Sequence, residues 1–123
     1  MNKIGLILIA HGSRDQRWRE PFEKLLADIK SGIRDDCIFL AYMDVASPTL
    51  HDAVSGAVKR GIKKLRVLPL FMAGGGHVEY DIPVQVEKVK GAFREVEIEL
   101  LKPVGEIPEV YSAIRKTAIS ALS

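Results

Sequence analysis

The sequence predicts an α/β fold in which one parallel sheet of four strands lies between two layers of helices, a three-layer α/β/α sandwich. Strand-like apolar runs alternate with helical patterns along the whole chain, which is the order of repeated βα units. Three of the four runs are almost continuously apolar, as is typical of strands that are covered on both faces. Right-handed crossovers between such strands place helices on both sides of the sheet.

The four strands are expected at Lys3–Ala10, Ile38–Val45, Leu65–Met72 and Val96–Leu101. The fourth run differs from the others, because its apolar residues alternate with Glu97 and Glu99. This alternation predicts an edge strand with one face in water. We expect the spatial order 2-1-3-4, which is a small sheet of the flavodoxin-like kind.

The first helix is predicted from apolar residues at spacings of three and four, namely Trp18, Phe22, Leu25, Leu26, Ile29 and Ile33. Proline is tolerated in the first turn of a helix, so Pro21 places the expected start near Arg19 or Glu20. The second helix is expected between a cap in Ser47-Pro48-Thr49 and a stop at Gly61. Its expected inner residues are Leu50, Val54, Ala57, Val58 and Ile62.

The third and fourth helices are predicted from their opening residues. Asp81 is the expected cap of the third helix, with Pro83 in its first turn. Its expected inner residues are Val86, Val89 and Phe93. The fourth helix is expected to open at Ile107-Pro108 and to bury Val110, Ile114, Thr117, Ala118 and Leu122.

Length and composition restrict the possible functions. The chain has 123 residues, enough for one domain over residues 1–123 and too few for two. The formal net charge is only +2, and the basic residues between Lys59 and Arg66 are expected to be solvated, so we expect no nucleic acid partner. We find no signal peptide and no apolar stretch of about 18 residues, so we expect a cytoplasmic protein without a membrane partner. The single cysteine, Cys37, is expected to be a small buried residue.

Residues that carry chemistry follow the first three predicted strands. His11-Gly12-Ser13-Arg14 follows the first strand, Asp44 ends the second, and Gly74-Gly75-Gly76-His77 follows the third. Ligands of open α/β sheets bind beyond the carboxyl ends of the strands. The strand order 2-1-3-4 puts His11 between Asp44 and His77. Two imidazoles and a carboxylate suit a divalent metal such as Fe, Co, Ni or Zn, so the pattern predicts a metal site.

Each of these residues also has a structural interpretation. A single histidine at a strand end is usually structural, and Asp44 is a candidate cap for the 46–49 turn. The triple glycine is a candidate hinge or phosphate cradle, although the chain has no GxGxxG after the first strand and no GxxxxGK[ST]. His51, in the first turn of the second helix, is expected to be solvated. His11, Asp44 and His77 together favour the metal site.

Three motifs make the chain similar to a known family. They are the segments 8–15 around His11, 41–50 around Asp44, and 68–83 around His77. In this order they resemble the class II tetrapyrrole chelatases, which insert cobalt, nickel or iron into sirohydrochlorin in cobalamin, coenzyme F430 and siroheme biosynthesis. The resemblance covers nearly the whole chain. The length is that of the family's short form, which supplies one half of a two-domain chelatase and is a homodimer.

The resemblance implies a sirohydrochlorin chelatase, a lyase, with Co²⁺ as the first choice of metal substrate, Ni²⁺ or Fe²⁺ as alternatives, and no organic cofactor. It implies that His11 and His77 bind the metal. We hypothesise that one of them also accepts a pyrrole proton, because neutral imidazole can do both near physiological pH. The family often has glutamate at the place of Asp44. The shorter aspartate favours a role through bridging water, or in orienting a histidine.

The expected substrate is a planar apolar ring rimmed by carboxylates, so its site is expected to combine an apolar floor with small residues and hydrogen-bond donors. Leu70 and Phe71 are expected in the floor, and Arg17 is expected to be solvated. The expected substrate contacts are Ser13, Arg14, Met72, Gly74, Gly75 and Gly76.

Two other functions compete with this one. A metal or tetrapyrrole carrier on the same fold needs the same residues, and only turnover separates it from an enzyme. A histidine phosphatase is disfavoured, because Ala10 stands where that class has a phosphate-binding arginine.

Overall fold

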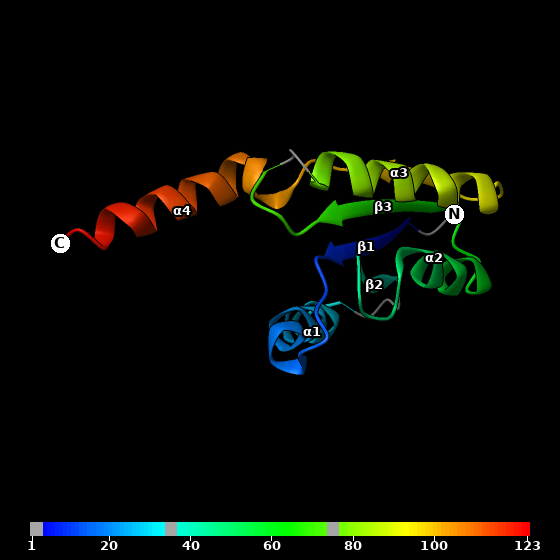
Figure 1. Ribbon diagram of the computed structural model, residues 1–123, viewed down its shortest axis with the longest axis horizontal. Coiled ribbons are helices and arrows are strands. Elements are labelled where there is room, and N and C mark those ends of the chain that lie inside the picture. The colour runs from blue at the N-terminus through cyan, green and yellow to red at the C-terminus, as the bar shows by residue number, and fades with distance from the viewer. Residues whose placement is uncertain (1–3, 34–36, 74–76) are drawn as a thin grey trace.

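The computed structural model describes residues 4–33, 37–73 and 77–123, with the backbone alone for 77–80. Its elements are β1 (Ile4–Ala10), α1 (Gln16–Ser31), β2 (Ile38–Tyr42), α2 (Leu50–Lys59), β3 (Lys64–Pro69), α3 (His77–Ala92), β4 (Glu97–Leu100), a short 3-10 turn η1 (Val104–Glu106) and α4 (Pro108–Ser120). The strands are parallel and lie in the order β2-β1-β3-β4 (Figure 1). The predicted fold class, element order and strand order are confirmed.

β2, β3 and β4 are shorter than predicted, and Lys3, the predicted first residue of β1, lies outside the described residues. β2 ends at Tyr42 rather than at Val45, and Val45 has a φ of 50°, which lies outside the extended region of a strand. β3 ends at Pro69, and the backbone N–H of Leu70 donates a last bond of 2.9 Å to the carbonyl of Ile9. In β4, Ile98 is buried and Glu97 and Glu99 are exposed, which confirms the predicted alternation.

Two helices begin earlier than predicted. α1 begins at Gln16, because the carboxylate of Asp15 accepts the backbone N–H of Arg17 at 3.0 Å and caps the helix there. Pro21 therefore lies inside α1, and the helix loses one backbone hydrogen bond to it. α3 begins at His77, so the predictions that Asp81 caps it and that Pro83 is in its first turn are wrong.

The predicted cap and stop of α2 and the predicted start of α4 are confirmed. Thr49 caps α2 in a capping box: the Thr49 hydroxyl accepts the N–H of Asp52 at 3.1 Å, and the Asp52 carboxylate accepts the N–H of Thr49 at 3.0 Å. Gly61, which follows α2, has a φ of 79°, in the left-handed region where glycine is favoured. α4 begins at Pro108 after Ile107.

α1 covers only part of its face of the sheet. Phe22, Leu26 and Ile29 pack against a small cluster on β1 and β2. The other predicted inner residues of this helix are exposed, contrary to the prediction, and they are Trp18, Leu25 and Ile33. Leu25 lies at the side of the stripe formed by Phe22, Leu26 and Ile29, Trp18 lies in the first turn of α1, and Ile33 lies beyond the end of the helix at Ser31.

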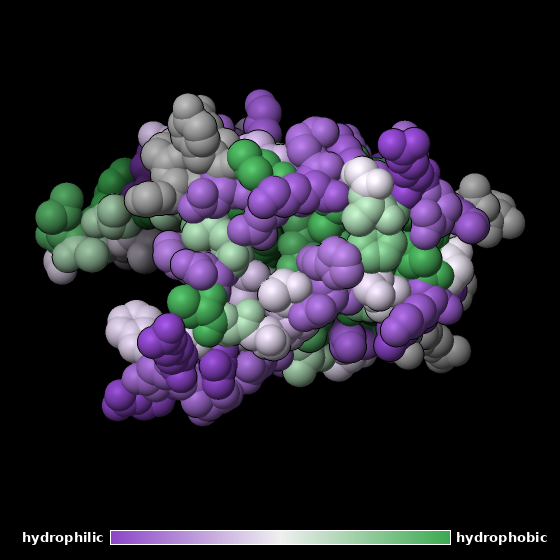
Figure 2. Space-filling model, turned by 45° about the vertical axis from the view of Figure 1, so that its right-hand side comes forward, coloured by the Kyte–Doolittle hydropathy of each residue, from purple (hydrophilic) through white to green (hydrophobic). Residues whose placement is uncertain are grey.

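α4 leaves the body of the protein instead of packing on the sheet (Figures 1 and 2). Every residue of α4 is at least partly exposed, and among the described residues its main contact is with η1. The prediction that Val110, Ile114, Thr117, Ala118 and Leu122 are buried is therefore wrong for the single chain. These residues do share one side of the helix, as their spacing predicts.

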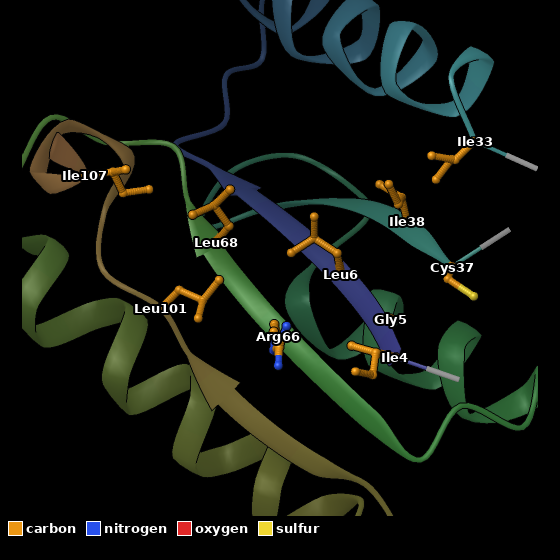
Figure 3. A pocket seen from close by; sticks show the side chains of 10 residues that line it. All are labelled: Ile4, Gly5, Leu6, Ile33, Cys37, Ile38, Arg66, Leu68, Leu101 and Ile107. Carbon is orange, nitrogen blue, oxygen red and sulfur yellow. The ribbon is translucent and has the colours of Figure 1, made fainter. Parts of the chain in front are cut away.

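The sheet face that α4 leaves open holds an apolar cavity of about 900 Å³ between α1 and β4 (Figure 3). We call it the sheet-face groove. Its lining includes Ile4, Leu6, Ile38, Leu68, Leu101 and Ile107.

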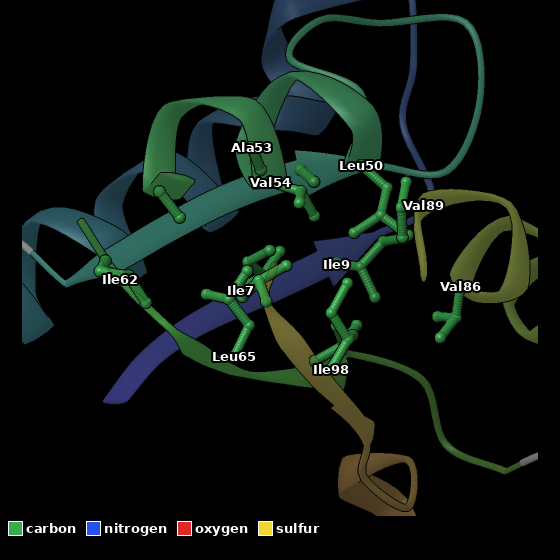
Figure 4. Packing of buried hydrophobic residues seen from close by; sticks show 14 of the residues in the cluster. Ile7, Ile9, Leu50, Ala53, Val54, Ile62, Leu65, Val86, Val89 and Ile98 are labelled. Atoms are coloured by element: carbon green, nitrogen blue, oxygen red, sulfur yellow. The ribbon is translucent and has the colours of Figure 1, made fainter. Parts of the chain in front are cut away.

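The main core lies on the other face of the sheet, under α2 and α3 (Figure 4). Leu50, Val54 and Ala57 of α2 and Val86 and Val89 of α3 are buried there, as predicted. Ile62 is buried as well, and Val58 and Phe93 pack at the edge of the cluster. Cys37 is buried, which also confirms the sequence prediction.

Candidate functional site

The predicted site lies at the carboxyl edge of the sheet, where β1 and β2 end next to each other. The backbone N–H of Met43 donates to the carbonyl of Ala10 at 2.8 Å, and that of Asp44 donates to the carbonyl of His11 at 3.2 Å. The structure therefore brings His11 and Asp44 together, although they are far apart in the sequence.

β3 is the other neighbour of β1, and the connection that follows it leads to His77, the first residue of α3. The predictions for Gly74, Gly75, Gly76 and the side chain of His77 fall outside the described part of the structure. Their place in the chain, after the strand beside β1, is the one that the predicted site requires.

The side chain of His11 is exposed and rests on an aromatic ring. Its imidazole meets Phe71 edge to face, with the ring centroids 5.8 Å apart and the planes at 65°. Phe71 follows β3 and packs against the main core. One side of the imidazole is therefore supported by the core, and the ring remains accessible from solvent.

Gly12 is required where the chain turns away from β1. Its φ is 98°, in a region that L side chains rarely adopt. A Cβ at this position would overlap the carbonyl oxygen of Asp44. Glycine therefore allows the close approach of the two segments that carry His11 and Asp44.

Asp44 is exposed, and its Oδ1 accepts the backbone N–H of Val45 at 2.9 Å. This bond is local to the 44–45 peptide, and the described structure shows no hydrogen bond from the carboxylate to the 46–49 turn. The φ of Val45, 50°, is uncommon for a β-branched residue. Val45 directly follows Asp44, so this uncommon backbone conformation lies at the candidate site, and no sequence pattern had indicated it.

The two predicted contacts after His11 differ in what they bind. The Ser13 hydroxyl accepts the N–H of Asp15 at 3.0 Å, and the Ser13 carbonyl accepts a bond of 3.0 Å from Nη1 of Arg19. Arg14 is exposed, and no described residue forms a hydrogen bond or ion pair with it. Its guanidinium is therefore available to an anionic ligand.

Arg17 is exposed, as predicted, but it is already paired. Its Nη2 lies 2.7 Å from Oδ2 of Asp15. The side-chain hydrogen bond from Arg17 holds the pKa of Asp15 below its ordinary value. Because Asp15 occupies Arg17, we do not count Arg17 among the groups that face a ligand.

Two further residues hold the edge in place, and the sequence did not single out either of them. Arg19 of α1 binds the Ser13 carbonyl, and Gln85 of α3 donates from Nε2 to the Met43 carbonyl at 3.0 Å. Gln85 therefore ties the helix that begins at His77 to the loop that carries Asp44. Both contacts join distant segments, so no local sequence pattern could have identified them.

The described residues contain no cluster of three or more metal-binding side chains. His11 and Asp44 are two such groups, and the predicted third, the side chain of His77, is not described. Met72, a predicted substrate contact, is 63% exposed next to Phe71. His51 is exposed and lies on Phe93, with 4.9 Å between the ring centroids. No helix in the described part of the chain is long and apolar enough to cross a membrane.

Comparison with known proteins finds relatives that all belong to one group, the sirohydrochlorin chelatases and CbiX proteins. A sequence model of the family described as CbiX matches residues 5–121. The chain is 29% identical to a sirohydrochlorin cobaltochelatase of Methanothermobacter thermautotrophicus, covering 98% of this chain and 94% of that protein. It is 26% identical to a sirohydrochlorin ferrochelatase of Bacillus subtilis, covering 91% of this chain but only 43% of that protein.

A solved structure is similar over almost the whole length. The crystal structure of a putative cobalamin biosynthesis CbiX protein from Marinobacter aquaeolei is 36% identical and superposes with a TM-score of 0.84. The match covers 98% of this chain and 96% of that one.

Proposed function

The chain belongs to the CbiX family, and from this premise we propose that it is a sirohydrochlorin chelatase, which inserts a divalent metal into the tetrapyrrole. Cobalt is the first metal to test, because the relatives that match this chain over almost their whole length are named cobaltochelatases. Nickel and iron are the alternatives, since a histidine and carboxylate set accepts all three. The chain matches less than half of the Bacillus ferrochelatase, which supports the further proposal that two copies work together as a homodimer.

The observation that carries the proposal is the setting of His11. Its imidazole is exposed at the sheet edge beside Asp44, with Phe71 supporting one side. A metal that is to be handed to a macrocycle must be bound weakly and from one side. An exposed imidazole on an apolar support meets that requirement, and His77, which follows the adjacent strand, is proposed as the second ligand.

Asp44 is proposed to complete the metal shell through water. One of its oxygens accepts the Val45 N–H at 2.9 Å, which fixes the direction of the carboxylate. The second carboxylate oxygen, Oδ2, has no hydrogen-bond partner among the described residues and can accept a hydrogen bond from a metal-bound water.

The macrocycle is proposed to lie over the exposed apolar residues beside His11. Met72 and Phe71 offer an apolar surface there, and the unpaired guanidinium of Arg14 offers a partner for a peripheral carboxylate. As the metal enters the ring, two pyrrole N–H protons must leave. Histidine is the residue type best suited to accept one, so we assign that role to His11 or His77.

The decisive experiment measures metal insertion directly. Purified protein is incubated without oxygen with sirohydrochlorin and each of Co²⁺, Ni²⁺ and Fe²⁺, and the absorbance change of the tetrapyrrole is followed. We expect multiple turnovers with the wild-type chain and a loss of about 100-fold or more in His11→Ala, in the range of a lost catalytic proton transfer.

His51→Ala is the matched control, because His51 is also exposed and also rests on a phenylalanine but is not one of the residues that follow a strand end. We expect it to retain wild-type turnover. A wild-type rate in His11→Ala would contradict the assignment of the site. Binding of one equivalent of sirohydrochlorin or metal without accelerated insertion would show a carrier instead of an enzyme.

A further inference from the structure

The peptide that joins Met43 to Asp44 is held from both sides by distant parts of the fold. Its N–H, which belongs to Asp44, donates to the carbonyl of His11 at 3.2 Å. Its carbonyl, which belongs to Met43, accepts the hydrogen bond of 3.0 Å from Nε2 of Gln85. The N–H and the carbonyl of a trans peptide point in opposite directions, so the two bonds together fix the plane of this peptide between the end of β1 and α3.

The plane of this peptide determines where Asp44 lies, because the Cα of Asp44 belongs to the same planar unit. Two backbone contacts support the arrangement. The N–H of Met43 donates to the Ala10 carbonyl at 2.8 Å, and the Asp44 carbonyl lies so close to Gly12 that a Cβ there would overlap it. The bond from Gln85 is the only one of these contacts that a side chain makes, so a substitution can remove it while the backbone stays the same.

Gln85 projects from a helix that is firmly packed on the sheet. Ile82, Val86 and Val89 of α3 are buried in the main core, and Figure 4 shows Val86 and Val89 among its side chains. Gln85 is half-buried and lies three residues after Ile82 and four before Val89, at the border of this buried stripe. Its amide therefore reaches the Met43 carbonyl from a rigid support.

We propose that Gln85 is a positioning residue of the metal site, which keeps the Asp44 carboxylate in reach of a metal bound to His11. This inference rests on the proposed function in one respect, the role of Asp44 in holding a metal-bound water. When the bond from Gln85 is lost, the Met43 carbonyl is no longer held by α3, and the carboxylate can take up positions from which it does not reach that water. The loss of such an outer partner typically lowers metal affinity about 10–100-fold.

The test is a double-mutant cycle between Gln85 and Asp44, measured as Co²⁺ affinity by isothermal titration calorimetry without sirohydrochlorin. Gln85→Met keeps the length of the side chain and removes the donor. We expect this substitution to weaken Co²⁺ binding about 10-fold or more. In the Asp44→Ala background we expect the same substitution to change the affinity by less than about 2-fold, because the carboxylate that the bond positions is then absent.

Val84→Met is the matched control. It places the same side chain one residue earlier on α3, at a position that is 46% exposed, and is expected to keep the wild-type affinity for Co²⁺. Thermal unfolding of each variant verifies that it is folded at the temperature of the titrations. A purely structural role of Gln85 would weaken binding equally with and without the Asp44 carboxylate, whereas a positioning role requires the carboxylate.

Equal losses of affinity in the two backgrounds therefore overturn the inference. So does wild-type affinity in Gln85→Met or in Asp44→Ala, or a wild-type chain that binds no Co²⁺. The chelatase proposal is decided separately, by turnover with sirohydrochlorin. A chain that shows the expected coupling without turnover keeps Gln85 as a positioning residue and overturns only the proposed enzymatic activity.

Discussion

The substitution Gly12→Ala tests how the sheet edge brings His11 and Asp44 together. Alanine at this position has to adopt a φ of 98°, and left-handed backbone costs an L residue about 1–2 kcal/mol. Its Cβ also overlaps the carbonyl oxygen of Asp44, which must move, and forced overpacking costs about 1–3 kcal/mol. We expect a total loss of about 2–5 kcal/mol in the free energy of unfolding.

Gly61→Ala is the matched control, because Gly61 has a φ of 79° and a Cβ added there would have nothing within 4 Å. It is expected to lose only the conformational part, about 1–2 kcal/mol. Urea unfolding of both variants gives the difference, and the insertion assay adds a second readout: Gly12→Ala should slow metal insertion, and Gly61→Ala should not. Equal stability losses in the two variants would refute the role we assign to the contact between Gly12 and Asp44.

Three further predictions concern stability. Burial, and then the negative charge of Glu23, raise the pKa of Tyr42 above 10.0. The folded state therefore holds this proton more tightly than the unfolded state, and the protein loses stability as the pH rises above about 10. Urea unfolding at pH 9 to 11 should show a smaller decline in the free energy of unfolding for Tyr42→Phe than for the wild type. The hydrogen bonds from Thr49 lower the pKa of Asp52 below 3.8. Their contribution to the free energy of unfolding is therefore present above that pH and is lost as the pH falls below it. The variant Asp52→Asn should lose less stability than the wild type when the pH is lowered through this range. Leu65, fully buried in the main core, should cost about 2–5 kcal/mol when replaced by alanine, measured by urea unfolding, and a loss below about 1 kcal/mol would contradict its place in the core.

The parts of the fold that the sequence predicted well depend on local interactions. The capping box of α2 joins Thr49 to Asp52, three residues apart, so its pattern can be recognised in the sequence alone. The alternation around Ile98 likewise indicates that one face of β4 is exposed to solvent, because neighbouring residues of a strand point to opposite faces. The order of βα units then left few possible topologies, and the predicted strand order is the observed one.

Helix starts were predicted less well where proline was the signal. Pro21 and Pro83 suggested first turns, but both lie inside helices that begin earlier. For α1 the reason is visible in the structure, because Asp15 caps the helix ahead of the proline. A proline restricts where a helix can begin, but a cap formed by a preceding side chain decides where it does begin.

For the candidate site, the sequence by itself indicated which residues follow the strands at the carboxyl edge of the sheet, because the apolar runs locate the strands and the order of βα units restricts their arrangement. Only the tertiary structure decided how they meet: Gly12 against the Asp44 carbonyl, His11 on Phe71, and Gln85 on the Met43 carbonyl. The same holds for α4, whose pattern shows that one side needs a cover. Its direction is set by the contact of Gly105 with the backbone of Phe71 and Met72. Contacts between segments so far apart in the chain leave no periodic trace in the sequence, so they are decided when the fold closes.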